Sequence, residues 1–209
     1  MEKQAFTAKI VHDGIQSKSC KVLELGANVG RNTLVIASLL DDPRNLVTLE
    51  SSKDVFPMLL ENRKATAHVF PENKLFRAEN AALSKTALMQ RGWQTVHVPK
   101  GQQEISPGFL PVDIISFSDL EAKYEIQFNT LIIDSEGSIF YSLFEDAENI
   151  LRNITLIIIE NDFQFLQHKE FIDASFRDAG FSLVYNQAGG FGPCFSVFYQ
   201  VWHKVNKNQ

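Results

Sequence analysis

The chain has 209 residues, 44% of which are hydrophobic, and it carries a formal net charge of −5 at pH 7. This length is enough for one α/β domain with a full core and is short for two domains. Acidic residues outnumber basic ones, 25 to 20, and no run of Lys or Arg forms a basic stripe. These features argue against a nucleic-acid partner and fit a small or neutral substrate better.

The two cysteines and the first residues indicate the compartment. Cys20 and Cys194 lie far apart in the sequence and match no metal-binding spacing, so we expect buried thiols in a reducing compartment. The first residues lack the apolar core of a signal peptide. The longest apolar runs are far shorter than the ~20 residues that cross a bilayer. We therefore expect a soluble, cytoplasmic protein without a membrane span.

Helical and strand patterns alternate through the first half of the chain. Phe6, Ile10 and Val11 recur at helical spacing, which indicates a leading amphipathic helix. Downstream, short apolar runs bounded by turn residues indicate strands, and helical patterns follow them. In chain order we expect helix 1–17, strand 21–25, a helix from after Gly30 to about Leu40, strand 46–50, helix 54–66, strand 74–78 and a loop at 81–84.

The second half continues this alternation and ends in an antiparallel pattern. Two short extended pieces within 88–98 flank Arg91 and Gly92, and the loose stretch 101–111 is expected to be a loop on the active-site side. Alternating residues over 181–187 and 194–201, joined by a glycine-rich turn, indicate a closing hairpin. The remaining elements expected are strand 112–116, helix 117–123, strand 129–133, helix 139–151, strand 154–160 and helix 165–179.

This order of elements predicts the fold class. Strands that alternate with helices, some of them apolar throughout, are typical of a parallel sheet covered on both faces. We expect an α/β fold, a single doubly wound Rossmann-like domain whose mostly parallel sheet ends in an antiparallel C-terminal hairpin. Ligands bind beyond the carboxyl ends of the strands in such sheets, so functional residues are expected there.

The turn after the first strand is the most informative motif. Glu24, Gly26, Asn28 and Gly30 have the spacing E-x-G-x-N-x-G between a predicted strand and a helix N-terminus, an arrangement that brings backbone close to a nucleoside. It is similar to the first motif of S-adenosylmethionine-dependent methyltransferases. A dinucleotide fingerprint needs G-x-G-x-x-G, so a nicotinamide cofactor fits poorly. Asn28 is explained equally well by a left-handed turn and by a ligand contact.

Glu50 ends the second predicted strand, about twenty residues after the glycine turn. A carboxylate at that position can accept hydrogen bonds from both hydroxyls of a ribose. A solvated carboxylate at a strand end is the alternative interpretation.

Two further strands end in acidic residues. Asp134 and Glu136 follow one apolar strand, and Glu160 ends the next, two residues before Asp162. Alternation would put Asp134 and Glu136 on one side and turn Ser135 away. Neighbouring strands lie ~4.8 Å apart, so these acids can converge, and crowded carboxylates bind protons readily, which suits a general base. Charge complementarity at helix N-termini is the alternative.

Other common catalytic patterns do not occur in the sequence. The five histidines do not pair at metal-binding spacing, and neither C-x-x-C nor G-x-S-x-G is present. We therefore expect neither a metal site nor a serine hydrolase.

Six blocks of the sequence together resemble the FkbM family of S-adenosylmethionine-dependent methyltransferases. They are L-E-L-G-A-N-V-G (23–30), L-E-S-S (49–52), N-A-A-L-S (80–84), I-D-S-E-G (133–137), I-I-I-E (157–160) and A-G-F-S (179–182). The first block is generic to the superfamily, whereas N-A-A-L-S and I-D-S-E-G are far more specific to FkbM. The chain departs from the family's usual pattern at Ser51, Ile132 and Ile139.

The resemblance implies a class I methyltransferase fold with a seven-stranded sheet and S-adenosylmethionine as cofactor. Residues 1–209 would form one domain, with a leading helix (1–17), a cofactor-binding half (21–84) and an acceptor-side half with the closing hairpin (112–201). The cofactor-binding residues would then be Glu24, Gly26, Ala27, Asn28, Gly30, Asn32, Glu50, Ser51, Asn80, Ala81 and Asp134.

The same resemblance implies roles for these residues. The turn 26–30 would border the methionine part of the cofactor, and Glu50 would hold the ribose with Ser51 beside it. Asn80 and Ala81 would flank the adenine. Asp134 and Glu136 would face the methyl group and the acceptor.

Members of the family commonly methylate hydroxyls, so we expect O-methylation of a sugar, glycan or secondary metabolite. A hydroxyl is a poor nucleophile at neutral pH, and we expect Asp134 to take its proton or orient it, with Glu136 and Glu160 assisting. N-methylation of another small acceptor and a cofactor-binding scaffold without turnover are the alternatives. The expected partner is a small-molecule or glycan acceptor, and a homo-oligomer stays open.

Overall fold

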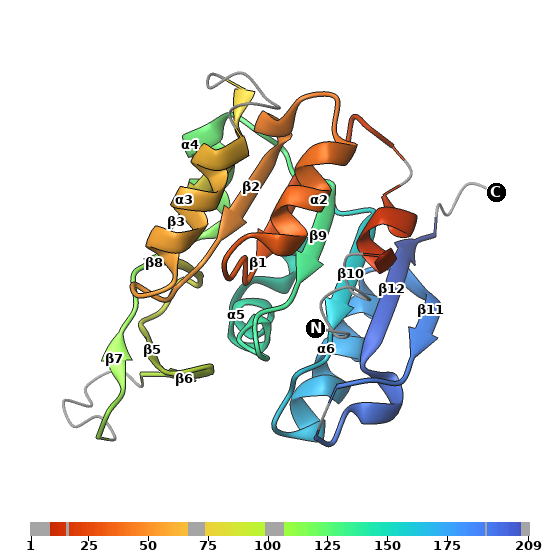
Figure 1. Cartoon of the computed structure of the whole chain (residues 1–209). Helices are drawn as coiled ribbons and strands as arrows, with labels where there is room; N and C mark the ends of the chain where they lie inside the picture. The colour runs from red at the N-terminus through yellow and green to blue at the C-terminus, as the bar shows by residue number, and fades with distance from the viewer. Residues whose placement is uncertain (1–8, 16, 67–73, 99–106, 191, 206–209) are drawn as a thin grey trace.

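A seven-stranded sheet forms the centre of the molecule (Figure 1). The computed structural model describes residues 9–15, 17–66, 74–98, 107–190 and 192–205. The strand order is β11-β12-β10-β9-β1-β2-β3. Within this sheet β12 runs in the opposite direction to the other six strands. The predicted mostly parallel, seven-stranded sheet with a C-terminal hairpin is therefore confirmed. The strands are β1 (Val22–Leu25), β2 (Leu46–Leu49), β3 (Arg77–Glu79), β9 (Thr130–Ile133), β10 (Leu156–Glu160), β11 (Phe181–Gln187) and β12 (Tyr199–Lys204).

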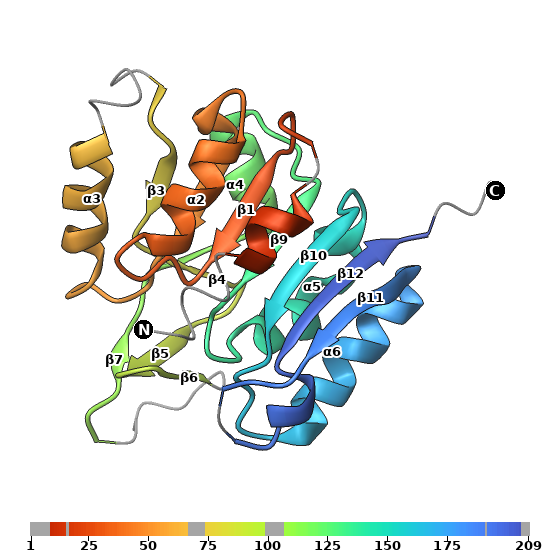
Figure 2. The ribbon, with the colours of Figure 1, turned by 45° about the vertical axis from the view of Figure 1, so that its right-hand side comes forward.

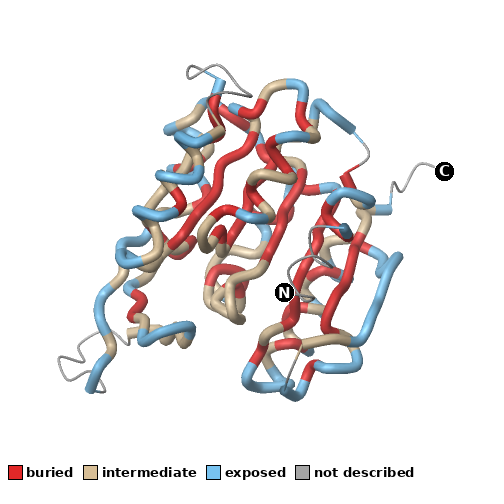
Figure 3. The backbone as a smooth tube through the Cα atoms, in the orientation of Figure 1, coloured by how far each residue is buried: buried red, intermediate tan, exposed pale blue. Residues whose placement is uncertain are grey.

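Helices cover both faces of this sheet (Figure 2). α2 and α3 lie with the helical residues 9–14 on one face, and α4, α5 and α6 lie on the other. In β9, Leu131 and Ile133 pack toward α4 to α6, whereas Ile132 packs toward α2. Both faces of the central strands are thus buried (Figure 3), which explains their apolar sequence. The helices are α2 (Arg31–Leu39), α3 (Phe56–Ala65), α4 (Phe117–Tyr124), α5 (Ile139–Leu151), α6 (Leu166–Asp178) and the 3₁₀ helices η1 (Pro43–Asn45) and η4 (Phe195–Val197).

The loop expected at 81–84 was a wrong prediction. These residues include β4 (Ala82–Leu83), which pairs in parallel with β8 (Ile114–Ile115), the central part of the strand expected at 112–116. The pair forms a separate two-stranded sheet. Each strand has only two residues and its partner is distant in the sequence, so no local periodicity marks it.

β3 and β12 begin later than the strands expected at 74–78 and 194–201. Arg77 is the first residue that pairs with β2, and Tyr199 pairs with the last residue of β10. The partner strand therefore decides where each strand begins. Local alternation alone extends the two segments too far.

A three-stranded sheet, β6-β5-β7, lies beyond the carboxyl end of the main sheet (Figure 1). β5 (Leu88–Arg91) and β6 (Gln94–His97) form the expected pair of extended pieces, joined by a two-residue turn at Gly92. β7 (Leu110–Pro111) pairs with β5 and belongs to the stretch expected to be a loop.

Some predictions fall partly outside the described residues. Phe6 and the rest of residues 1–8 lie outside, as do 101–106, but residues 9–14 are helical as expected and bury Ile10 and Val11. Both cysteines are free, Cys194 fully buried and Cys20 half-buried. Among the helices in the described ranges, none combines the length and apolar character needed to cross a bilayer.

The turn after β1 is held between the ends of β2 and β9. The Gly26 and Ala27 N–H groups both donate to the Leu49 carbonyl at 3.0 Å, and the Asp134 N–H donates to the Leu25 carbonyl at 2.9 Å. Gly26 has φ 87°, and a Cβ placed on it would lie 1.8 Å from the Asp134 carbonyl oxygen. Glycine is therefore required here both by conformation and by the neighbouring backbone.

Replacing Gly26 with alanine should destabilise the protein more than the same change at Gly180. Gly180 has a similar φ of 86°, but nothing lies within 4 Å of its Cβ position. Left-handed backbone costs an alanine about 1–2 kcal/mol at either site, and steric overlap adds about 1–3 kcal/mol at Gly26 alone. Urea unfolding of Gly26→Ala and Gly180→Ala measures the difference. Equal losses would contradict the proposed backbone contact.

Candidate functional site

A cavity of about 200 Å³ opens at the carboxyl ends of β1, β2, β9 and β10. These strand ends point toward the β5–β6 hairpin (Figure 1), which supplies part of the lining. This is the region where open parallel sheets bind ligands. The lining residues are Leu25, Gly26, Asn28, Leu49, Glu50, Ser51, Ala81, Ala82, Leu83, Gln90, Trp93, Thr95, Asp134, Ser135, Glu136, Ser138, Ser142 and Glu160.

Most of the predicted site residues reach this cavity. Those that line it are Gly26, Asn28, Glu50, Ser51, Ala81, Asp134, Glu136 and Glu160, whereas Glu24, Ala27, Gly30, Asn32 and Asn80 are not part of the lining. Ala27 is buried, and Gly30 stands at the N-terminus of α2 with φ 93°. The Asn32 Oδ1 atom is buried and accepts no hydrogen bond from the described residues.

Glu50 is held firmly at the end of β2. Its side chain is 5% exposed, and its two carboxylate oxygens accept hydrogen bonds from the Asn28 N–H (2.8 Å) and the Ser52 N–H (2.7 Å). Burial raises the pKa of Glu50, and these two backbone hydrogen bonds oppose the shift. Each carboxylate oxygen has a second lone pair, so Glu50 can still accept hydrogen bonds from a ligand.

Two asparagines shape the surroundings of Glu50. Asn28 takes a left-handed φ of 51°, and its own Oδ1 accepts the Val29 N–H at 2.8 Å. The turn interpretation of Asn28 is therefore confirmed, and its side chain also borders the cavity. Asn80 donates from Nδ2 to the Glu50 carbonyl at 2.8 Å, so it supports the strand end from behind.

The acids of β9 and β10 converge. Carboxylate oxygens of Asp134, Glu160 and Asp162 all lie within 4.8 Å of one another. Asp134 and Glu160 line the cavity, and Glu160 is only 4% exposed. Like charges this close repel one another, and a proton or a cationic ligand between them relieves the repulsion.

The extended strand conformation expected to continue beyond β9 is not present. β9 ends at Ile133, and Glu136 and Gly137 take left-handed φ values of 50° and 81°. The chain therefore turns instead of continuing as a strand. Asp134, Ser135 and Glu136 all belong to the cavity lining, but the Ser135 Oγ atom is itself buried.

Glu24 lies inside the protein beneath the glycine turn. Its Oε2 accepts hydrogen bonds from the hydroxyls of Thr33 and Thr48, both at 2.6 Å. Burial raises the pKa of Glu24 to about 7, and the two hydroxyls oppose this shift. The structure thus gives Glu24 a position in which it links β1 to β2 and α2.

The β5–β6 hairpin contributes residues that sequence reasoning missed. Gln90, Trp93 and Thr95 line the cavity opposite the strand ends, together with Ser138 and Ser142 of the segment that starts α5. The one signal that the sequence offered for this role was a tryptophan next to a glycine, between the two predicted extended pieces. No sequence pattern shows that the hairpin folds over the cavity.

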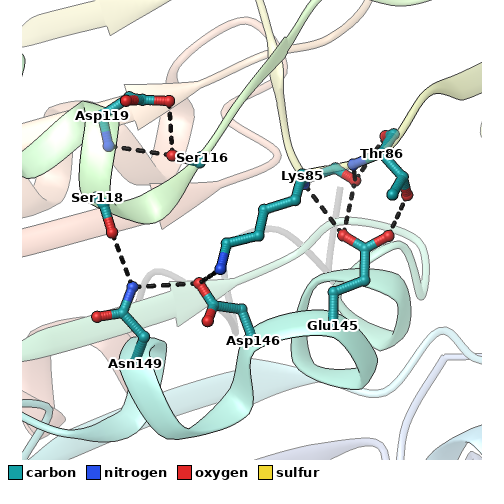
Figure 4. Close-up of polar contacts among 9 residues, drawn as sticks. Lys85, Thr86, Ser116, Ser118, Asp119, Glu145, Asp146 and Asn149 are labelled. Atoms are coloured by element: carbon teal, nitrogen blue, oxygen red, sulfur yellow. Dashed lines mark hydrogen bonds and ion pairs between the residues drawn. The ribbon is translucent and has the colours of Figure 1, made fainter.

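A polar network fastens the start of this hairpin to α5 (Figure 4). The Glu145 carboxylate accepts hydrogen bonds from the Lys85 N–H at 3.0 Å and from the Thr86 hydroxyl. The Lys85 ammonium pairs with Asp146 at 2.8 Å, and Asn149 donates to the same carboxylate at 3.1 Å. Asp146 also interrupts the helical backbone, with φ −151° and ψ 34°. The chain entering β5 is thus tied to the kink of α5.

No protein-family model matches this chain, and no curated protein matches it either. Several solved structures that resemble it are named as methyltransferases. One is the FkbM methyltransferase from Methylobacillus flagellatus, with a TM-score of 0.57 and 10% identity over 89% of this chain and 44% of that chain.

Two further similar structures hold SAM or SAH. The magnesium protoporphyrin IX methyltransferase from Synechocystis, with bound SAM, has a TM-score of 0.56 and 10% identity, covering 97% of this chain and 80% of that one. The O-methyltransferase from Bacillus cereus, in complex with SAH, has a TM-score of 0.53 and 14% identity, covering 97% and 81%. These likenesses show that the chain has the Rossmann-like methyltransferase fold.

Glu24 should make stability fall as the pH rises. The folded protein keeps the Glu24 proton up to about pH 7, while the unfolded chain releases it above about pH 4.5. Between these values rising pH favours unfolding by up to ~1.4 kcal/mol per unit. Glu24→Gln removes this contribution, so its free energy of unfolding should rise relative to the wild type across that window.

Urea unfolding at a series of pH values measures this difference. Glu61→Gln, a change at an exposed glutamate of α3, is the control and should show no such trend. A difference between Glu24→Gln and the wild type that stays constant with pH would rule out the raised pKa.

Proposed function

We propose that this chain is an S-adenosylmethionine-dependent methyltransferase that acts on a hydroxyl group. The observation that carries the proposal is the charge of the cavity. Its described lining includes four carboxylates, those of Glu50, Asp134, Glu136 and Glu160, and no Lys, Arg or His. The fold supports the proposal, because similar structures named as methyltransferases hold SAM or SAH.

This charge favours a cationic ligand. S-adenosylmethionine carries a sulfonium and an ammonium group, which nearby carboxylates stabilise. Dinucleotides and nucleoside phosphates carry negative phosphates, which proteins usually neutralise with Arg or Lys. The described lining offers no such side chain. The cavity therefore fits S-adenosylmethionine better than a nicotinamide cofactor.

The residues present fit this cofactor. Glu50 can accept hydrogen bonds from the ribose hydroxyls, because its position is fixed by two backbone N–H groups. The turn from Gly26 to Asn28, bare of bulky side chains, would border the methionine part. Ser51 would lie beside the ribose, and Ala81 would flank the adenine together with Asn80, whose Nδ2 donates to the Glu50 carbonyl.

The cofactor supplies a methyl group on a good leaving group. The protein must align the acceptor oxygen and remove its proton. We assign this proton to Asp134, with Glu160 close to it and Glu136 on the same wall of the cavity. Asp134 would accept the hydroxyl proton as the acceptor oxygen takes the methyl group, for which the neutral thioether of the bound cofactor would be the leaving group.

A hydroxyl of a sugar, glycan or secondary metabolite is the acceptor that we propose. The resemblance of the N-A-A-L-S and I-D-S-E-G blocks to the FkbM family supports it, and so does the likeness to the FkbM methyltransferase structure. The lining also includes the hydroxyls of Thr95 and Ser138, which can donate to or accept from neutral polar ligands.

Glu50→Gln should weaken the binding of S-adenosylhomocysteine about tenfold to a hundredfold. A charged acceptor of hydroxyl hydrogen bonds is lost while the shape is kept, and such bonds contribute about 1.5–3 kcal/mol. Calorimetric titration measures the affinity. Glu79→Gln is the matched control, because Glu79 also ends a strand but contacts Tyr124 and Lys123 outside the cavity lining. Unchanged affinity in Glu50→Gln would contradict the ribose role.

Asp134→Asn should lower turnover by about 10²–10⁴-fold, the usual contribution of a general base. Binding of S-adenosylhomocysteine should change much less, because this product has no sulfonium charge. Transfer of a radiolabelled methyl group to a panel of hydroxylated sugars and metabolites measures turnover. Asp113→Asn, at an exposed aspartate paired with Lys53, is the control.

Near-normal turnover in Asp134→Asn would remove Asp134 from catalysis. Transfer by the wild type only to amines would replace O-methylation with N-methylation. Binding of S-adenosylhomocysteine without transfer to any acceptor class would favour a scaffold.

A further inference from the structure

Trp93 is a large apolar side chain at the mouth of the cavity. It lies in the two-residue turn between β5 and β6, is 57% exposed, and belongs to the cavity lining. Water-exposed aromatic surface beside a cavity is a favourable contact for a planar ligand, because stacking removes both faces from water.

The hairpin that carries Trp93 is held at its tip. Gln90 accepts a hydrogen bond from the Ser51 hydroxyl at 2.9 Å and donates to the Gly92 carbonyl at 2.8 Å. Ser51 directly follows Glu50, so the tip of the hairpin is tied to the end of β2.

The same hairpin is also held at its base. The His97 ring stacks on Tyr141 of α5 with ring centroids 6.1 Å apart. The polar network of Glu145 and Asp146 anchors the chain just before β5. Trp93 therefore stands on a β-hairpin that is braced at both its tip and its base.

The chemistry of the cavity divides into two ends. The carboxylates of Asp134, Glu136 and Glu160 belong to the segments that follow β9 and end β10. At the second end the Glu50 carboxylate directly precedes Ser51, and the other lining residues of the β4 segment and the hairpin are neutral: Ala81, Ala82, Leu83, Gln90, Trp93 and Thr95. A neutral, planar ring with polar edges suits that second end.

We infer that Trp93 stacks on the adenine ring of the cofactor and closes the cavity over it. The inference rests on the proposed function, in which Glu50 holds the ribose. The adenine is bonded directly to that ribose, and the Ser51–Gln90 contact brings the hairpin tip to the same place. The acceptor must instead reach Asp134, which removes its proton. A planar acceptor stacked on Trp93 would lie at the end of the cavity away from Asp134.

Tryptophan fluorescence tests this placement. The chain has two tryptophans, and Trp202 is 1% exposed, with its indole N–H donating to Gln200. A change on ligand binding therefore reports Trp93. S-adenosylhomocysteine and adenosine should both quench the emission, homocysteine should not, and Trp93→Phe should abolish the signal.

Calorimetry with variants gives the contribution of the ring. Trp93→Ala should weaken S-adenosylhomocysteine binding about tenfold, as expected for removal of one base-stacking side chain, and Trp93→Phe should restore most of the affinity. Phe195→Ala is the control, because Phe195 is equally exposed at 56% but lies outside the cavity lining.

The outcomes separate this inference from the proposed function. If the wild type binds S-adenosylhomocysteine but Trp93→Ala binds it equally well and no quenching occurs, the inference is overturned and the function stands. If Trp93→Ala raises only the acceptor KM, Trp93 contacts the acceptor and the inference is again overturned. If the wild type does not bind S-adenosylhomocysteine, both are overturned.

Discussion

The contact between residue 26 and the Asp134 carbonyl is the constraint on which the cavity depends. Only a glycine leaves room for that carbonyl, so the ends of β1 and β9 can lie against each other without a side chain between them. The Leu49 carbonyl ties β2 to the same turn through two N–H groups. Glu50 and Asp134, far apart in the sequence, therefore face one opening.

The sheet could be predicted because short apolar runs in the sequence show which strands are buried. Apart from Thr130 at the start of β9 and Glu160 at the end of β10, both strands are apolar, since both of their faces are covered by helices. β8 lies within the strand expected at 112–116, but β4 could not be predicted, because a two-residue strand carries no periodicity and its partner is about thirty residues away. The helices over 117–123 and 139–151 were found within a residue of their observed ends.

The part of the site that lies at the ends of strands could be predicted from the sequence. Glu50, Asp134 and Glu160 follow from the rule that ligands bind beyond the carboxyl ends of parallel strands, and the structure brings all three to the cavity. The hairpin residues could not be found this way, because tertiary contacts alone carry Trp93 across the opening. Glu24 differs from these three, since it lies outside the cavity lining and accepts hydrogen bonds from the hydroxyls of Thr33 and Thr48.

The position of β12 has a consequence for biosynthesis. β12 lies between β10 and β11, and in the described chain β11 pairs with no other strand. The sheet therefore stays incomplete on the ribosome until residues 199–204 have left the exit tunnel. Until then β10 has an open hydrogen-bonding edge next to a highly apolar surface, and such an edge favours pairing with other chains.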